Sequence, residues 1–282
     1  MSQKSYDNTP TLYLIPTPIG NMEDITIRAI NTLKMVDVVF CEDTRVTSQL
    51  LKHLNINKKL ISSHNYNESK NKDKLIEYLS NGSNVGLVSD RGTPIISDPG
   101  YELANYAIEK GYNVVSLPGA TALIPALTSS GISPMPFYYY GFLNNKDAAR
   151  RKELESLKKI EATLILYEAP HRINKTLIDM CNILGNNRKI SISREITKKY
   201  EEVYRGTIEE LIKQNNEYKG ELVIVVEGNK DINEYNNLTI IDHVNLYIED
   251  GKSSMDAIKI VAKERGMKKS DIYNEYHNIE KK

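Results

Sequence analysis

Three loops rich in glycine and proline contain the residues best suited to hold a small ligand. They read PTPIGN (16–21), SDRGTPIISDPG (89–100) and SLPGATA (116–122), and each follows a short apolar run. Glycine lets a ligand approach the backbone closely, and proline stiffens a loop before the ligand arrives. None of them has the G-x-x-x-x-G-K-[ST] pattern of a triphosphate site or the G-x-G-x-x-G pattern of a dinucleotide site. A moderately sized, mostly uncharged ligand therefore fits them better.

Side chains of mixed charge follow other apolar runs. The stretches EDTR (42–45), HNYNE (64–68), YEAPHR (167–172) and SREITKKYEE (193–202) each begin where a strand is expected to end. Charges at strand ends suit a site better than the solvated face of a helix does, although a structural salt bridge is an equal alternative for any single one. For Asp90, taken alone, a loop cap is the alternative.

The elements that position these loops follow from the apolar runs. In the first part of the chain, short apolar runs alternate with amphipathic segments, and this predicts a mostly parallel sheet with helices on both faces. Asp98, just before Pro99, is expected to cap the third helix. The expected strands are 12–16, 38–43, 60–64, 85–90 and 113–119, and the expected helices are 26–36, 70–79 and 101–109. Because ligands bind at the carboxyl edge of such sheets, the three loops are expected to share one site.

From about Pro118 the pattern changes to that of a mixed sheet flanked by helices. A helix of small residues (119–131) comes first. Strands are expected at 137–142, 163–169, 189–196, 201–208 and 220–228, the third and fourth of them paired, with helices at 146–159 and 173–184 and a short helix before the last strand.

A polar stretch (229–237) is expected to link this part to two short helices broken at Gly266, with Ser253 and Asp256 as a capping pair. These helices are either a helix-turn-helix or an extension that packs on the body. The domains predicted are 1–117, 118–230 and 231–282.

Composition narrows the class of protein. The 282 residues include 37 basic and 37 acidic ones, so whole-chain charge does not indicate a nucleic-acid binder, although a local patch is possible. Two such patches are Arg150 with Arg151 and the group Lys263, Arg265, Lys268 and Lys269; for the first, a solvated helix face is the favoured alternative. Neither the cysteines nor the histidines have metal-ligand spacing. With no apolar core of a signal peptide and no run near about 18 apolar residues, a soluble, metal-free cytoplasmic protein is expected.

The three loops, in this order, resemble those of the tetrapyrrole methylase superfamily, whose members use S-adenosylmethionine. The set IPTPIGNMEDIT, EDTR, SDRGTPIISDPG, LPGATA, YEAPHR and RE-T-K is similar to the ribosomal RNA small subunit methyltransferase I family. The resemblance spans Leu12 to about Gly228, and it departs from the family at Arg91, where a small alanine is usual. It implies methylation of the ribose 2′-hydroxyl of a cytidine in the decoding region of 16S ribosomal RNA.

The resemblance also implies two α/β domains, a parallel-sheet N-terminal one and a mixed-sheet C-terminal one, with the cofactor between them and a small helical extension. It places S-adenosylmethionine against Pro18, Ile19, Asp90, Gly92, Thr93, Ile95, Pro118, Gly119, Thr121, Ala122, Phe142 and Tyr167. No metal is implied.

On the substrate side, the resemblance favours a cleft that binds the ribosomal RNA of the small subunit. The residues assigned to it are Arg45, His64, Asn65, Arg172, Arg194, Glu195 and Lys198. Removal of the hydroxyl proton has three candidates, Asp43, Glu168 and His171, and the sequence does not choose among them. The family suggests a homodimer with no membrane association. Two alternatives stay open: a tetrapyrrole C-methyltransferase of corrin or siroheme synthesis, and an RNA chaperone that binds S-adenosylmethionine without turnover.

Overall fold

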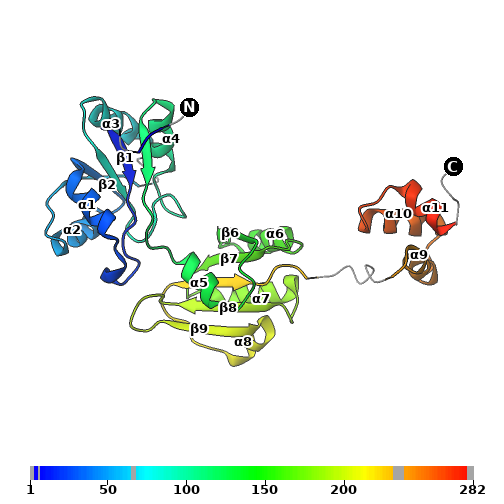
Figure 1. Cartoon of the computed structure of the whole chain (residues 1–282). Coiled ribbons are helices and arrows are strands. Elements are labelled where there is room, and N and C mark those ends of the chain that lie inside the picture. Colours follow the sequence, from blue (N-terminus) through cyan, green and yellow to red (C-terminus); the bar gives the residue numbers. More distant parts are fainter. Residues whose placement is uncertain (1–2, 6, 65–67, 231–237, 278–282) are drawn as a thin grey trace. The chain divides into compact units, whose positions relative to one another are not determined.

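The computed structural model describes residues 3–5, 7–64, 68–230 and 238–277, which form two compact units, Met1–Gly228 and Asn229–Lys282. Each unit has its own hydrophobic core. Figure 1 shows the helices and strands of each unit. In the described part of the chain, none of the helices is both long enough and apolar enough to cross a membrane.

The first sheet of the larger unit is wholly parallel, with the strand order β3-β2-β4-β1-β5. Its strands are β1 (Thr11–Leu14), β2 (Val38–Cys41), β3 (Lys59–Ser62), β4 (Val85–Val88) and β5 (Asn113–Ser116). From β1 the chain crosses toward β2, and from β4 it crosses the other way, toward β5. The neighbouring strands β1 and β4 therefore flank the point where the winding reverses, which is where such sheets bind ligands.

Helices cover both faces of this sheet because alternate strand residues point to opposite sides. Leu12, Phe40 and Leu87 pack on one face with α3 (Glu68–Ser80) and α4 (Tyr101–Glu109). Val39 and Val88 pack on the other with α1 (Ile27–Met35) and α2 (Thr44–His53). Figure 1 shows these two pairs of helices on opposite sides of the strands. The strands read as continuous apolar runs since both of their faces are buried.

The second sheet is mixed, with the order β6-β7-β10-β8-β9. Among its described neighbouring pairs, β6 and β7 are parallel and the other three pairs are antiparallel. Its strands are β6 (Phe137–Phe142), β7 (Thr163–Glu168), β8 (Lys189–Arg194), β9 (Glu202–Thr207) and β10 (Leu222–Val226). One face packs against α6 (Asp147–Leu157), α7 (Ile173–Leu184) and α8 (Ile208–Gln214), and the other packs against α5 (Leu123–Ser129). Together with the parallel sheet, this confirms the two predicted α/β architectures.

The smaller unit consists of α9 (Ile240–Glu249), α10 (Ser254–Glu264) and α11 (Lys269–Tyr276), packed around Val244, Ile258 and Ile272. As expected, the Ser253 hydroxyl caps α10 by accepting a hydrogen bond from the Asp256 N–H, at 3.2 Å. The sequence patterns did not predict α9. Most of the predicted linker, residues 231–237, lies outside the described residues.

Two local predictions in the first sheet need correction. The stretch after β2 forms the ten-residue helix α2, which was not predicted. Asp98 does not cap α4: the N-cap residue is Gly100, with φ of 122°, and it makes no side-chain cap. The buried carboxylate of Glu68, on α3, instead accepts the Leu103 N–H at 3.1 Å. A neighbouring helix thus satisfies the first turn of α4, and Asp98 is left free to face elsewhere.

Candidate functional site

The three loops lie together at the carboxyl edge of the parallel sheet, joined by backbone contacts. Thr17 of the first loop (16–21) pairs with Gly92 of the second (89–100) through two backbone hydrogen bonds, of 2.9 and 3.0 Å. The Thr93 hydroxyl donates to the Ala120 carbonyl of the third loop (116–122) at 3.0 Å. These contacts fix the three loops as one assembly.

Close packing joins the first and third loops directly. A Cβ added at Gly119 would lie 2.4 Å from the Cβ of Pro16, which is nearer than real Cβ atoms approach. The pairing of proline with glycine therefore has a steric reason: the rigid ring of one loop fills the space that the other leaves by lacking a side chain.

The second loop has a strained backbone. Gly92, Ile95, Ser97 and Gly100 all have positive φ, at 82°, 77°, 63° and 122°. Positive φ is costly for a β-branched residue such as Ile95, and such strain persists only where the surroundings impose it. The Ser97 hydroxyl is hydrogen-bonded to the hydroxyl of Tyr139, on β6, at 2.7 Å, which ties the loop to the second sheet. The strained loop is therefore held in two places, at Gly92 by the first loop and at Ser97 by the second sheet.

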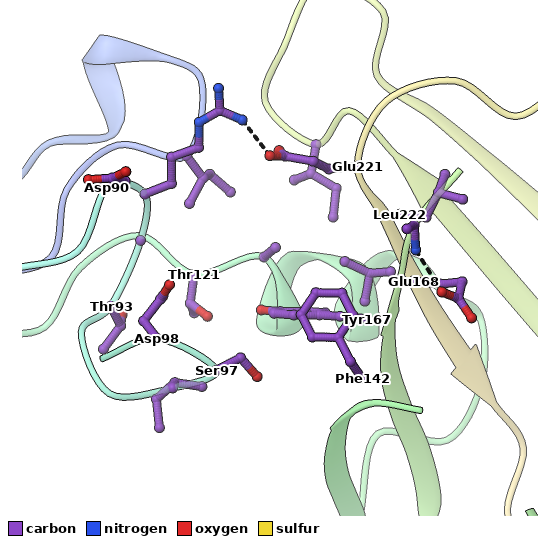
Figure 2. Close-up of a pocket in the computed structure, with 18 of the residues that line it drawn as sticks. Asp90, Thr93, Ser97, Asp98, Thr121, Phe142, Tyr167, Glu168, Glu221 and Leu222 are labelled. Atoms are coloured by element: carbon purple, nitrogen blue, oxygen red, sulfur yellow. Dashed lines mark hydrogen bonds and ion pairs between the residues drawn. The ribbon is translucent and has the colours of Figure 1, made fainter. Parts of the chain in front are cut away.

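A pocket of about 570 Å³ opens between the second loop and the second sheet. That volume is in the range of small-molecule sites. Figure 2 shows Asp90, Thr93 and Asp98 on one side of it, and Phe142 and Tyr167 on the other. Its lining combines apolar walls with a few hydroxyl and carboxyl groups.

An aromatic group forms the wall that belongs to the second sheet. The ring of Tyr167 makes edge contacts with those of Tyr139 and Phe142, at centroid distances of 5.1 and 5.5 Å. Phe142 remains half exposed at 52%. Burial raises the pKa of the Tyr167 phenol, which keeps this wall uncharged. Such a surface can take the flat face of a base or the apolar part of a ligand.

Asp98 is a carboxyl group that projects into the pocket without a hydrogen-bond partner among the described residues. Burial and, to a smaller extent, the negative charges of Glu42 and Asp90 together raise its pKa from 3.8 to about 7. Asp90, by contrast, accepts the backbone N–H of Asp43 at 3.0 Å, so it also has a positioning role within the protein.

The rim of the pocket carries ion pairs that cross between the two sheets. Arg91 pairs with Glu221, just before β10, as Figure 2 shows. Lys198 pairs with the same carboxylate at 2.8 Å and with Glu195 at 2.9 Å. The positive charge of Arg91, the position at which this chain departs from the pattern it resembles, is therefore balanced by Glu221.

The residues assigned to a cofactor fall into two groups. Lining the pocket are Ile19, Asp90, Gly92, Thr93, Thr121, Ala122, Phe142 and Tyr167. Pro18, Ile95, Pro118 and Gly119 are not among the residues that line it; Ile95 packs against the core of the parallel sheet. The assignment of these four residues to the cofactor site stays a prediction. Gly119 contributes to the assembly of the loops through its contact with Pro16.

The three candidates for proton removal lie apart. Asp43 caps α2 and binds the Arg45 side chain, which holds the pKa of Asp43 at about 2. Glu168 lines the pocket, but its buried carboxylate accepts from the Ala169 N–H at 2.7 Å, the Thr176 hydroxyl at 2.6 Å and the Arg172 guanidinium. His171 is exposed and does not line the pocket. All three stay predictions, and Asp43 is already fully ionised near neutral pH.

None of the described substrate-side candidates lines the pocket. Arg45 and His64 follow β2 and β3, and Asn65 lies outside the described residues. Arg172 is held by Glu168. Arg194 pairs with Glu202 at 3.0 Å. Glu195 and Lys198 belong to the rim pairs described above, so the whole set stays a prediction for the surface around the pocket.

One of the two arginines of a proposed basic patch is buried in an ion-pair cluster, and the other remains exposed. The Arg150 side chain is 2% exposed and binds Asp147 at 2.9 Å and Asp179, on α7, at 2.6 Å; Arg151 binds the same Asp179 at 2.9 Å. Arg150 therefore joins α6 to α7, and neither an RNA track nor a solvated face describes it. Within the described ranges, no three His, Cys, Asp or Glu side chains are grouped to hold a metal ion.

Several lining residues were not predicted from the sequence. They include Val46, Ile96, Ser97, Asp98, Ile196 and Glu221. Ser97 and Asp98 sit inside a loop that the sequence singled out, so glycine and proline content did indicate their segment. Glu221 carries no such signal, because it reaches the pocket only through the pairing of β10 with β7 and β8.

Comparison with known proteins agrees with this architecture. The family model described as Tetrapyrrole (Corrin/Porphyrin) Methylases matches residues 11–212. Among solved structures, a diphthine synthase superposes with a TM-score of 0.60 at 15% identity, covering 77% of this chain and 90% of that one. The uroporphyrin-III-C-methyltransferase of Thermus thermophilus gives 0.56 at 19%, covering 77% and 94%. At these identities the likeness shows the fold.

Relatives found by sequence have a much higher identity to this chain than these solved structures do. The Ribosomal RNA small subunit methyltransferase I of Bacillus subtilis is 48% identical over 98% of this chain and 97% of its own length. The protein of that name in Vibrio cholerae is 43% identical over 81% of each chain. The chain therefore belongs to the tetrapyrrole methylase family and, within it, to the family of ribosomal RNA small subunit methyltransferase I.

Proposed function

We propose that this protein transfers a methyl group from S-adenosylmethionine to the ribose 2′-hydroxyl of a cytidine in the decoding region of 16S ribosomal RNA. The observation that carries the proposal is the gathering of three loops around a pocket of about 570 Å³ in a chain of this family. The names of its relatives supply the substrate class.

The residues present fit the proposed donor. The aromatic wall of Phe142 and Tyr167 offers apolar contact to the adenine or the methionine chain. The Thr93 and Thr121 side chains also line the pocket and supply hydroxyls for the sugar or the amino acid end. The carboxyl groups of Asp90 and Asp98 suit a ligand that carries positive charge.

When bound, S-adenosylmethionine supplies a methyl carbon that its sulfonium already activates. The task of the protein is then to hold the acceptor oxygen in line with that carbon, and orientation of this kind can contribute about 7 kcal/mol or more. The strained second loop and its tie to Tyr139 keep the pocket walls fixed for that purpose.

The proton of the 2′-hydroxyl needs an acceptor or solvent. Asp43, Glu168 and His171 remain the proposed candidates, and their settings differ. Glu168 would first have to release donors such as Thr176, and Asp43 is a weak base because Arg45 keeps its pKa at about 2. His171 is exposed but does not line the pocket.

The remaining assignments are part of the same proposal. Arg45, His64, Asn65, Arg172, Arg194, Glu195 and Lys198 surround the acceptor site and contact the RNA of the small subunit. The protein works in the cytoplasm as a homodimer, without a metal. The division at 117/118 and 230/231 remains our prediction for its domains.

Small ribosomal subunits from cells that lack this gene provide the test. Purified protein and labelled S-adenosylmethionine are added to subunits, to naked 16S RNA or to a precorrin, and methylated riboses are mapped. We expect one methylated cytidine ribose, in the decoding region. Transfer to the precorrin alone would instead identify a tetrapyrrole C-methyltransferase, and donor binding with no transfer to any acceptor would identify an RNA chaperone.

A further inference from the structure

Among the described carboxyl groups that line the pocket, Asp98 is the one that no hydrogen bond or ion pair engages. It lies in the second loop between Ser97, which is bonded to Tyr139, and Pro99, whose ring restricts the backbone. Gly100 then packs so closely that a Cβ there would lie 2.6 Å from Leu87. The backbone on both sides of Asp98 is therefore fixed, and its side chain is held toward the pocket (Figure 2).

The surroundings of Asp98 leave its charge unbalanced. Glu42, after β2, and Asp90, after β4, add negative potential, while Tyr139 and Tyr167 are neutral phenols on β6 and β7. On the rim, Arg91 and Glu221 pair with each other. A buried charge without a partner is costly, so the site gains most from a ligand that brings a positive charge.

We propose that the Asp98 carboxylate is the group by which the pocket distinguishes the positively charged sulfonium donor from the neutral thioether that remains after transfer. This inference rests on the proposed function. When the methyl carbon bonds to the acceptor oxygen, the electrons of the broken C–S bond stay on sulfur and cancel its charge, and the oxygen loses its proton. The attraction to Asp98 therefore ends with the reaction, which favours release of the product.

The aromatic wall makes a sulfonium the better partner. Phe142 and Tyr167 lie across the pocket from Asp98, and aromatic faces attract cations that are poorly hydrated. An ammonium group needs several hydrogen-bond acceptors, whereas a sulfonium needs only nearby negative charge. An acid on one side and rings on the other provide that setting.

Calorimetry on the full chain tests this directly. The affinities for S-adenosylmethionine and S-adenosylhomocysteine are measured at pH 6 and pH 8 for the wild type and for Asp98→Asn. The sulfonium lowers the pKa of the amino group in S-adenosylmethionine, so each wild-type affinity ratio (S-adenosylmethionine over S-adenosylhomocysteine) is divided by that of Asp98→Asn at the same pH. Because Asp98 ionises near pH 7, its ionised fraction rises about ten-fold from pH 6 to pH 8, and we expect the quotient to rise by up to that factor.

Asp98→Asn should give a ratio that is lower than that of the wild type at pH 8 and that lacks the rise due to ionisation of Asp98. The matched control is Glu102→Gln, on α4, which also removes a carboxylate, but one that pairs with Lys72 at 3.0 Å and does not line the pocket. It should leave the ratio and its pH dependence as in the wild type.

An Asp98→Asn ratio equal to that of the wild type would overturn the inference while leaving the proposed function intact. Unchanged affinities would then leave Asp98 without a role in binding, and equal losses for both ligands would assign it to the shared ammonium group. If the variant did not fold, a wild-type ratio that is flat between pH 6 and pH 8 after allowance for the titration of that amino group would overturn it as well. A wild-type protein that binds neither ligand would refute the proposed function itself, and the inference with it.

Discussion

At the scale of single residues, the pocket gets its character from side chains whose partners are distant in sequence. The local sequence predicts that Asp98 caps α4. Instead, Glu68, 35 residues before Leu103, accepts the backbone N–H of Leu103 in the first turn of that helix. Freed from that role, Asp98 faces the pocket with a pKa of about 7. The same carboxyl is unfavourable for the stability of the empty protein.

The pH dependence of stability should reveal this cost. Since the folded-state pKa of Asp98 lies above its ordinary 3.8, the folded protein binds more protons than the unfolded one between about pH 4 and 7. Stability from this group is thus fully present below pH 4 and is lost as the pH rises through 7. After allowance for solvent screening, we expect Asp98→Asn to raise the Tm by roughly 2–4 °C at pH 8 and not at pH 4. Scanning calorimetry without ligand measures both, and an equal Tm at pH 8 would contradict the buried setting.

Arg172 allows a test of the substrate side. It does not line the pocket, and its guanidinium holds the buried Glu168 carboxylate. We expect Arg172→Ala to lower kcat/KM for the ribosomal substrate by about ten-fold or more while the donor affinity stays within about two-fold. Loss of one partner of a buried carboxylate should also cost about 1–3 kcal/mol of stability.

The Arg172→Lys variant is the control, since it retains a positive charge but not the forked donors. Its kcat/KM should fall between those of the wild type and the alanine variant. If calorimetry showed that Arg172→Ala loses donor affinity first, Arg172 would belong to the donor side of the pocket.

At the scale of elements, the assembly of three loops depends on strand order. Only because β1 lies between β4 and β5 do the first, second and third loops start from neighbouring strands. Their contacts then follow: the pairing of Thr17 with Gly92, the Thr93 hydrogen bond and the packing of Gly119 on Pro16. A substitution that disrupts any of these contacts should move the loops and so alter the pocket that they line.

Gly119→Ala is the sharpest test of that assembly. Its new Cβ would lie 2.4 Å from the Cβ of Pro16, so the first and third loops must separate. We expect the affinity for S-adenosylmethionine to fall about ten-fold or more in calorimetry. Gly206→Ala, on β9, is the control, because the nearest atom there is the Glu210 carboxylate, at the flexible end of its side chain. Equal affinities in the two variants would show that the loop contact does not shape the site.

At the scale of the whole molecule, the chain divides into two units with separate cores. Ile258 is fully buried in the core of the smaller unit, among Val244, Val261 and Ile272. The pocket is lined only by residues of the larger unit. Stability and donor binding should therefore respond separately to substitutions in the two units.

Ile258→Ala should destabilise the smaller unit by about 2–5 kcal/mol through the cavity it creates. Hydrogen exchange of the α10 amides should accelerate, while the donor affinity stays at the wild-type value. Met255→Ala, at a position on the same helix that is 47% exposed, should change neither. A fall in donor affinity with Ile258→Ala would mean that the smaller unit supports the pocket.

The sequence by itself determined the order and type of most elements, the clustering of glycine and proline at the carboxyl ends of β1, β4 and β5, and membership of the family. These properties are local, since burial of alternate or periodic apolar residues and the conformational limits of glycine and proline act within a few residues. Helix α2 was missed because its first residues were assigned to a strand end, and the segment of α9 was given no element.

Only the tertiary structure decided which side chains meet. The ion pair between Arg91 and Glu221 joins residues 130 positions apart in the sequence. Asp179, on α7, pairs with both Arg150 and Arg151 of α6. Glu68, and not Asp98, accepts the backbone N–H of Leu103 in the first turn of α4, and Asp98 lines the pocket. Strand order and the packing of helices on the sheets set these meetings. Such long-range contacts leave no periodic trace in the sequence, so the chemistry of the pocket follows from the fold.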